Sequence, residues 1–294
     1  MDMDLGAFVT PYFRGDVPAS ENAEALVGRA ELATELDYEY VEVGDHHVTS
    51  DDQFFQNVPT AGRLAAEVDH LAVLFLLPMY HPLYVAEYLG TLGAFTDRLD
   101  FWCAVGGNPD SFDALDIPLS DRAGRIEEAL AVVTRLLDGD PVSFDGDHFS
   151  LDETTISPTA DPRICIGGLA RPAVERAGRL GDAWVVHPSE RVDDLRRKRG
   201  WFEDAGGDTV IVRRDALVLE DGDEARERVE SMLRAGYRGW PEDAEYPLVG
   251  DAEDVAADLE ALQEAGADEV VVGAMDHETA AETFREVAAA RERL

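Results

Sequence analysis

The sequence predicts an α/β protein, a single (β/α)8 TIM barrel with a small insertion at about residues 140–162. Strand-like and helix-like segments alternate along the whole chain, which favours a parallel sheet. The length of 294 residues suits a barrel, since such folds take roughly 250 residues plus insertions. A doubly wound open sheet is the alternative, but the first strand-to-helix connection lacks the Gly-x-Gly-x-x-Gly fingerprint of that fold. We therefore expect one barrel domain over residues 1–294.

Hydrophobic periodicity predicts the elements of the first half. Short apolar runs indicate buried strands, and apolar residues three or four positions apart indicate helices. In the helix expected at 21–36, Leu26, Ala30 and Ala33 share one face, and Ser20 is a suitable N-cap. The predicted strands are 5–9, 40–43, 71–77 and 99–105, and the predicted helices are 21–36, 59–68, 85–95 and 122–137.

Residues 140–162 interrupt this alternation and then it resumes. Residues 142–149 contain Asp145-Gly146 between apolar positions, which predicts a small surface hairpin. The later predicted strands are 163–166, 183–186, 210–219 and 269–272, and the later helices are 172–180, 192–203, 224–235, 252–265 and 278–292.

The composition is strongly acidic. Asp and Glu number 62 against 25 Lys and Arg, a net charge of −37, and Lys198 is the only lysine. Such a chain repels phosphate backbones and anionic lipids, so we expect neither nucleic-acid nor membrane partners. The acids are dispersed, which suggests a haloarchaeal protein adapted to molar salt, where self-repulsion is screened. An ordinary acidic protein from a GC-rich genome is the alternative.

Targeting signals and cysteine chemistry are not evident. The longest apolar run is 71–77, too short for a membrane span, and the acidic N-terminus does not resemble a secretory signal. We therefore expect a soluble, cytoplasmic protein. Cys103 and Cys165 lie in separate apolar runs and indicate neither a disulfide framework nor a zinc site.

Four predicted strand ends carry residues suited to function, which in a barrel lies where the strands end. They are Val43-Gly44-Asp45-His46-His47, Leu77-Pro78-Met79-Tyr80-His81-Pro82, Val105-Gly106-Gly107-Asn108 and Ile166-Gly167-Gly168. In the last, glycines allow close backbone approach, and the following helix start offers N–H groups to an anion. This pattern predicts a phosphate site to which Arg171 could contribute, although a simple tight turn explains the glycines equally well.

The histidines allow three interpretations. His46 could act as a base or hydrogen-bond donor whose protonation Asp45 influences. His46, His81 and His187 could bind a metal ion, or the histidines could be structural. Adjacent strand residues point to opposite faces, so His47 is expected to be structural. The remaining histidines are expected to be solvated: His70, His148 and His277.

Together these motifs resemble the luciferase-like monooxygenase superfamily of flavin- and deazaflavin-dependent barrel enzymes. The resemblance is colinear over nearly the whole chain. It rests on the segments at 35–47, 77–82, 92–99, 122–128, 142–149, 166–184 and 248–251.

The resemblance implies coenzyme F420 or FMN at the carboxyl-terminal mouth of the barrel, with no metal. His46 stands at the family's position for the catalytic histidine near the reactive ring, and a non-prolyl cis bond is expected within 73–75. The phosphate would lie at Gly167-Gly168 and the following helix start. The expected cofactor-binding residues are Asp45, His46, Val73, Leu74, Gly106, Gly107, Asn108, Gly167, Gly168, Leu169 and Ala170.

Two departures from the family pattern limit the assignment. Leu169 and Ala170 replace the usual serine or threonine, and Gly107-Asn108 stands where F420-dependent sugar dehydrogenases carry an acid. Asp45-His46 resembles the deazaflavin branch, so F420 is favoured slightly over FMN. We expect hydride transfer to or from a small organic substrate, in a homo-oligomer, a dimer. A catalytically silent flavin-binding relative and a metal-dependent barrel hydrolase or isomerase are the alternatives.

Overall fold

The computed structural model describes residues 3–13, 15–49, 52–237, 240–241 and 243–294. The chain has the predicted fold, an α/β TIM barrel of eight parallel strands with helices between them. The short strand β12 (Leu248–Gly250) pairs with β11 in addition. The eight barrel strands are β1 (Asp4–Phe8), β3 (Tyr40–Val43), β5 (His70–Leu76), β6 (Arg98–Ala104), β9 (Arg163–Gly167), β10 (Ala183–Val186), β11 (Thr209–Val218) and β13 (Glu269–Ala274).

The helices also follow the predicted order. In the part of the chain that the structure describes, no helix is both long and apolar enough to cross a membrane. The α-helices are α1 (Ala19–Glu35), α2 (Asn57–Leu64), α3 (Pro82–Leu92), α4 (Pro109–Ala114), α5 (Arg122–Leu137), α6 (Arg171–Leu180), α7 (Val192–Asp204), α8 (Gly222–Arg234), α9 (Ala252–Ala265) and α10 (Ala280–Arg291). The described residues also include the 3-10 helices η1 (Leu77–Met79) and η2 (Leu119–Asp121).

The chain divides into two compact units. Unit 1 comprises Met1–Thr10, Glu24–Glu42 and Ile166–Leu294, and unit 2 comprises Pro11–Ala23 and Val43–Cys165. We describe each unit by itself.

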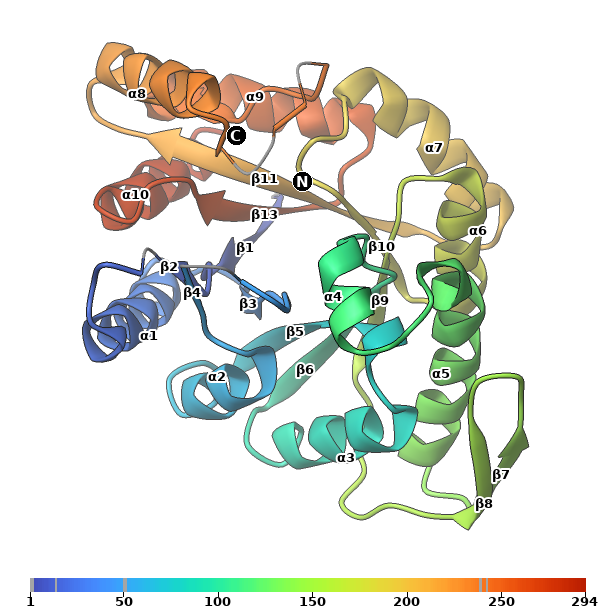
Figure 1. Ribbon diagram of the computed structural model, residues 1–294. Coiled ribbons are helices and arrows are strands. Elements are labelled where there is room, and N and C mark those ends of the chain that lie inside the picture. The colour runs from blue at the N-terminus through green and yellow to red at the C-terminus, as the bar shows by residue number, and fades with distance from the viewer. Residues whose placement is uncertain (1–2, 14, 50–51, 238–239, 242) are drawn as a thin grey trace. The chain divides into compact units, whose positions relative to one another are not determined.

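Unit 1 is built on a parallel sheet in which β1 pairs with β3 and β13, and β11 pairs with β13, β10 and β12. All six residues of β13 are buried, as its near-continuous apolar sequence predicts. Helices α8 and α9 pack on β12. Helix α10 packs on β11 and β13, beside which it lies in Figure 1. Helix α9 begins with a capping box between Asp251 and Asp254 and ends at Gly266, whose φ of 102° is a left-handed conformation.

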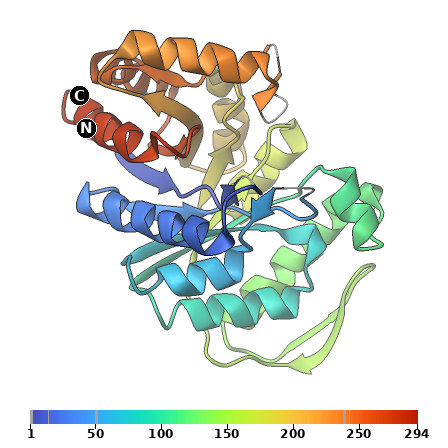
Figure 2. The ribbon, with the colours of Figure 1, turned by 60° about the vertical axis from the view of Figure 1, so that its left-hand side comes forward.

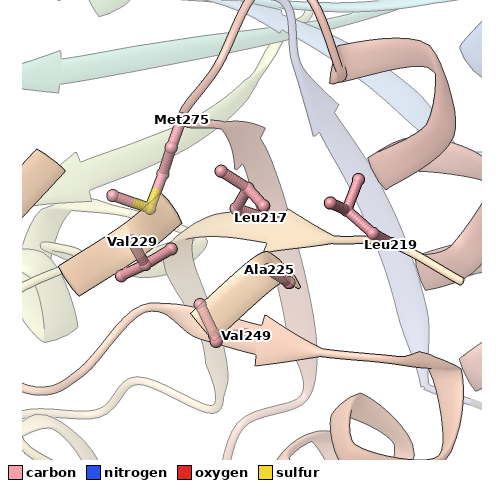
Figure 3. Close-up of a cluster of buried hydrophobic side chains, with 6 residues drawn as sticks. All are labelled: Leu217, Leu219, Ala225, Val229, Val249 and Met275. Atoms are coloured by element: carbon pink, nitrogen blue, oxygen red, sulfur yellow. The ribbon is translucent and has the colours of Figure 1, made fainter. Parts of the chain in front are cut away.

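A buried apolar cluster joins α8 to the carboxyl-terminal part of β11 (Figure 3). Leu217 and Leu219 pack against Ala225 and Val229 of α8. Burying one such leucine or valine side chain contributes about 1.5–3 kcal/mol, so this cluster holds α8 on the sheet. The cluster consists of Leu217, Leu219, Ala225, Val229, Val249 and Met275.

Unit 2 is built on the parallel pair β5 and β6, which run in unbroken register from His70↔Arg98 to Leu76↔Ala104. Helix α2 packs on β5, and α3 packs on α5. At Gly90 of α3 a Cβ atom would lie 2.1 Å from the carbonyl oxygen of Pro158, so only glycine lets the segment after the hairpin cross this helix. Cys103 and Cys165 are both buried and are not joined in a disulfide.

The insertion forms the predicted hairpin, with strands β7 (Val142–Asp145) and β8 (Ser150–Thr154), and Figure 2 shows it at the lower edge of unit 2. The turn is longer than the Asp-Gly pair suggests, because Asp145 pairs with Ser150. Glu128 of α5 accepts the backbone N–H groups of Asp147, His148 and Phe149 at 2.9–3.1 Å. This carboxylate therefore fastens the turn to α5.

Candidate cofactor site

Asp45 lies two residues beyond β3 and is the centre of a polar cluster in unit 2. Its side chain is fully buried. Oδ2 accepts hydrogen bonds from the backbone N–H of Leu76, at the end of β5, and from the Tyr80 hydroxyl, at 2.8 and 2.9 Å. The carboxylate thus links the ends of two barrel strands to the turn that follows η1.

The histidine paired with Asp45 is His47. Its Nε2 lies 3.4 Å from Asp45 Oδ1, an ion-pair distance. The His46 ring instead packs against Phe54, with the centroids 5.6 Å apart, and the His46 carbonyl accepts a hydrogen bond from Gln56. His47 therefore acts on Asp45 more strongly than His46 does, although the expected electrostatic interaction between Asp45 and His46 is also present. Residues 44–49 have no regular secondary structure, so the alternation of a strand does not continue through them.

The electrostatics of this cluster follow from burial. Removal from water raises the pKa of Asp45, and the charge of His47 and the hydrogen bonds from Leu76 and Tyr80 oppose this only in part. Burial, followed by the neighbouring Asp45 charge, raises the pKa of Tyr80 far above its ordinary value. The tyrosine therefore remains a hydrogen-bond donor to the carboxylate at every physiological pH.

Val73 and Leu74 lie in the regular part of β5. Val73 is fully buried, whereas Leu74 is partly exposed and its carbonyl accepts a hydrogen bond from Asn57 at 2.8 Å. The expected cis bond within 73–75 is absent: among the described residues the cis peptide bond is Ser157–Pro158. The uninterrupted register with β6 explains this correction, because a regular parallel ladder is built from trans peptides.

The end of β6 supplies the next predicted residues. Gly106 has a φ of +69°, which favours glycine, and a Cβ atom added at Gly107 would meet nothing within 4 Å. Asn108 caps α4 by accepting the N–H of Asp110. The same short helix carries Ser111, whose hydroxyl donates to the His47 carbonyl at 2.8 Å. Open space at Gly107 is compatible with close approach of a ligand.

In unit 1, residues Gly167 to Ala170 lead into α6. Ala170 is the N-cap of α6 and provides no side-chain acceptor for the first helical turn. Gly168 has a packing reason to be glycine, since a Cβ atom there would lie 2.5 Å from the Cβ of Ala173. Arg171 pairs with Glu175 at 2.7 Å along the helix, so its charge is already partly compensated. Pro172 has no N–H, and the N–H groups of Ala173 and Val174 already donate to the Ala170 carbonyl. An anion here would therefore depend on the N–H groups that precede Pro172.

The other histidines have local roles. His81 Nδ1 accepts the N–H of Leu83 at the start of α3, and His187 Nδ1 lies 2.7 Å from the Ser189 hydroxyl. The described ranges contain no group of three or more His, Cys, Asp or Glu side chains that could hold a metal ion. His70 is not solvated as expected, because it bonds the buried Asp100 at 2.9 Å.

A separate cavity of about 310 Å³ lies in unit 1 and includes none of the predicted site residues. Buried Arg214 donates to the carbonyls of Pro188 and Glu190, and Glu245 accepts the N–H of Val192. These contacts hold the loop before α7 in place. The only lysine, Lys198 of α7, also donates to the Glu190 carboxylate at 2.7 Å.

Sequence reasoning missed three supporting residues: Asn57, Tyr80 and Ser111. Tyr80 belongs to a strand end that was singled out, and its polar side chain beside prolines was the available signal. Asn57 and Ser111 lie in helices α2 and α4, and nothing in the local sequence relates them to β3 or β5.

Comparison with known proteins connects this geometry to a family. Uncharacterized proteins of Mycobacterium tuberculosis are 28% identical over 166 residues, which is 54% of this chain and 57% of theirs, so the match spans little more than half of those relatives. An F420-dependent hydroxymycolic acid dehydrogenase of Mycobacterium tuberculosis is 24% identical over 228 residues, covering 72% of this chain and 63% of that protein.

Solved structures share the fold over the full length. A monooxygenase, RslO1, from Streptomyces bottropensis has a TM-score of 0.84 at 22% identity, with 98% of each chain covered. An F420-dependent secondary alcohol dehydrogenase in complex with an F420–acetone adduct has a TM-score of 0.82 at 20% identity, with 99% of each chain covered. The family of luciferase-like monooxygenases matches residues 3–293. The chain therefore belongs to the luciferase-like monooxygenase family.

Proposed function

We propose that this protein is an oxidoreductase that uses F420 or FMN and transfers hydride to or from a small organic substrate. The observation that carries the proposal is the family match over residues 3–293. The polar cluster around Asp45 supports it, because buried ionisable groups at strand ends are the usual functional elements of a barrel.

We assign to the cofactor the residues that the sequence predicts for it. Asp45, His46, Val73, Leu74 and the Gly106–Asn108 turn would form the ring site. Because the side chains of Asp45 and Val73 are buried, Val73 would contribute its backbone and Asp45 would act through the residues that it contacts. Gly167, Gly168, Leu169 and Ala170 would hold the phosphate through backbone N–H groups that precede Pro172. When bound, the cofactor supplies two-electron hydride chemistry.

His46 is the residue we assign to catalysis. It is partly exposed and follows the end of β3, and its ring is supported by Phe54 at a centroid distance of 5.6 Å. An imidazole held in this way can donate a hydrogen bond or move a proton beside the reacting atoms.

F420 is our preferred cofactor, on the basis of Asp45-His46 and of relatives described as F420-dependent. The test is parallel titration of the full-length protein with F420 and FMN, followed by absorbance and fluorescence. Tighter binding of F420 would support the assignment. Tighter binding of FMN would instead identify FMN as the cofactor. If the protein bound neither F420 nor FMN, the proposed function would be contradicted.

The acidic composition motivates a second proposal, that the protein is adapted to high salt. We also propose that it is a cytoplasmic homodimer and that it binds neither nucleic acid nor membranes. The relatives described above come from mycobacteria and do not support a haloarchaeal source. With a net charge of −37, lowering salt from molar to tens of millimolar should lower the melting temperature through self-repulsion. An unchanged melting temperature across this range would contradict the adaptation.

A further inference from the structure

We propose that the cavity lined by α8, α9 and β12 is a second ligand site, which binds a small zwitterionic amino acid. The carboxylate of this ligand would lie against Arg214, and its ammonium group toward Asp258. The cavity has a volume of about 310 Å³, at the lower end of the range of small-molecule sites, about 300–1,000 Å³. None of the residues assigned to the cofactor lines it, so this inference does not depend on the oxidoreductase function.

The cavity lies within unit 1, on one face of β11. Arg213 packs its guanidinium on the Phe8 ring, 4.2 Å from the centroid, and the next residue of the strand, Arg214, points to the opposite face. Val249 belongs both to the cavity lining and to the apolar cluster of Figure 3. The cavity therefore adjoins the packed contact of α8 with β11.

Arg214 is a buried cation in the cavity lining, with only 2% of its surface exposed. Its Nη1 donates to the carbonyls of Pro188 and Arg213 at 3.1 and 3.0 Å, and its Nη2 donates to the carbonyl of Glu190 at 3.0 Å. A guanidinium has five N–H donors, so at least two remain for another acceptor. In the part of the chain that the structure describes, no carboxylate accepts a hydrogen bond from Arg214, although buried charges are usually paired.

The charge of Arg214 is accordingly incompletely compensated. Burial lowers the pKa of Arg214 to about 10, and the surrounding acids, of which Glu245 acts most strongly, oppose this only in part. The guanidinium is still cationic at neutral pH. A ligand carboxylate, which can bind a guanidinium through two parallel hydrogen bonds, would supply the closely bound anion.

The opening of the cavity carries the opposite charge. Asp258 and Glu230 are exposed, whereas Arg214 and Leu248 are buried, so the acids lie nearer to the solvent. Partial removal from water, followed by the charges of Asp254 and Glu245, raises the pKa of Asp258, and Arg214 opposes this. A ligand ammonium group would stabilise the ionised form of this carboxylate.

The other charged side chains of the lining already have partners within unit 1. Arg226 Nη2 lies 2.6 Å from the Asp254 carboxylate, and Glu245 accepts the N–H of Val192 at 2.8 Å. Glu230 forms an ion pair along α8 at 3.5 Å. One buried cation and one acid nearer to the opening therefore remain for a ligand.

This arrangement selects the class of ligand. A phosphate or a dicarboxylate would be repelled by the acids at the opening, and a diamine would be repelled by Arg214. The rest of the lining suits an aliphatic side chain, because it is apolar: Val192, Pro247, Leu248, Val249, Ala261 and Leu262. An apolar α-amino acid satisfies all three requirements.

The experiment is isothermal titration calorimetry of the full-length protein without cofactor, with L-leucine, L-valine and L-methionine as probes. At least one should bind saturably, with one molecule per chain. The N-acetyl derivative of the tightest probe lacks the ammonium charge and should bind about tenfold more weakly, and its amide, which lacks the carboxylate, about 100-fold more weakly. Binding of none of the three probes, or equal binding of the amide, would overturn the proposal.

Two variants locate the ligand. Arg214→Met removes the guanidinium and should abolish measurable binding, and unchanged binding would overturn the proposal. Because this variant also loses three hydrogen bonds to carbonyls, Asp258→Asn at an exposed position covers the case in which it does not fold. Asp258→Asn should weaken the amino acid about tenfold but should not weaken its N-acetyl derivative, because only the amino acid carries the ammonium group.

Glu260→Gln is the matched control for Asp258→Asn. It removes one acid from another exposed position of α9, outside the cavity lining, and should leave both affinities unchanged. Equal weakening in Asp258→Asn and Glu260→Gln would overturn the site, as would equal weakening of the amino acid and its N-acetyl derivative in Asp258→Asn. Since no cofactor is present, these results stand apart from the test of F420 and FMN binding.

Discussion

Two buried carboxylates in unit 2, Asp45 and Asp100, lie at opposite ends of the strands and are compensated to different degrees. Asp100, in β6, accepts a hydrogen bond from His70 on Oδ1 at 2.9 Å and two from Arg163 on Oδ2 at 2.8 and 3.1 Å. Asp45 has both of its donors on one oxygen and a histidine 3.4 Å from the other.

The pKa values of the two carboxylates shift in opposite directions because they are compensated to different degrees. Burial alone would raise the pKa of Asp100, but the His70 hydrogen bond and the Arg163 charge outweigh it and lower the pKa. At Asp45 burial prevails and the pKa is raised. Asp100, at the amino-terminal ends of β5, β6 and β9, is therefore the better compensated of the two, and Asp45 lies at the carboxyl-terminal ends, where the functional residues of barrels are found. This division matches the general arrangement of TIM barrels.

The largest effect is expected at Asp100, as a loss of unfolding free energy. Asp100→Ala leaves the Arg163 and His70 donors without their buried acceptor, and breaking such a pair costs about 3–5 kcal/mol. Urea unfolding should show this loss. Asp45→Ala, which removes a less compensated carboxylate, is the matched control and should cost less. Equal losses would contradict the comparison.

The next largest effect is expected at His46, near the carboxyl-terminal end of β3, as a loss of turnover. His46→Ala should lower turnover about 100- to 10,000-fold, because a proton-transfer or hydrogen-bonding group is lost beside the reacting atoms. Cofactor affinity should fall much less. His70→Ala is the control at the other end of the strands, since its partner Asp100 is structural. A turnover loss in His70→Ala as large as in His46→Ala, at equal folded fraction, would contradict the assignment.

Most of the fold was predictable because buried strands and amphipathic helices leave strong local patterns. The predicted elements at 40–43, 122–137, 183–186 and 252–265 match β3, α5, β10 and α9 residue for residue. The elements that were missed are short: α4 has six residues, β12 has three, and β2 (Tyr12–Phe13) and β4 (Gln53–Phe54) have two each. Segments of this length carry too few residues for a period to emerge.

The site was predictable only as a set of strand ends. Asp45 was identified, but its partners Leu76 and Tyr80 come 31 and 35 residues later, and tertiary packing alone brings them to it. The pairing with His47 was missed because the chain leaves the strand geometry after Val43. The Asp100 cluster was missed for a similar reason, since Arg163 is 63 residues away along the chain.

A smaller effect should separate ligand contact from packing. Gly107→Val should leave stability unchanged, because a Cβ atom there has open space, but should weaken F420 or FMN binding about tenfold if the ring lies against this turn. Gly168→Val should weaken binding and also destabilise the protein, because its Cβ would lie 2.5 Å from that of Ala173. Titration and thermal melts measure both. Unchanged affinity in Gly107→Val would exclude the β6 turn from the cofactor site.

The smallest effect, a slope with pH, is the most direct comparison of the two carboxylates. For Asp100 the folded pKa is lowered, so its stabilisation is present above the ordinary value of 3.8 and is lost as pH falls through the folded pKa. For Asp45 the folded pKa is raised, so its contribution is fully present below 3.8 and is lost as pH rises through the folded pKa. Urea unfolding of the wild type, Asp100→Asn and Asp45→Asn across these two ranges should therefore give opposite trends. The stability advantage of the wild type over Asp100→Asn should shrink on acidification, and that over Asp45→Asn should shrink as pH rises above 3.8. Parallel trends would mean that Asp45 is as well compensated as Asp100, and would remove the physical contrast between the two ends of the strands.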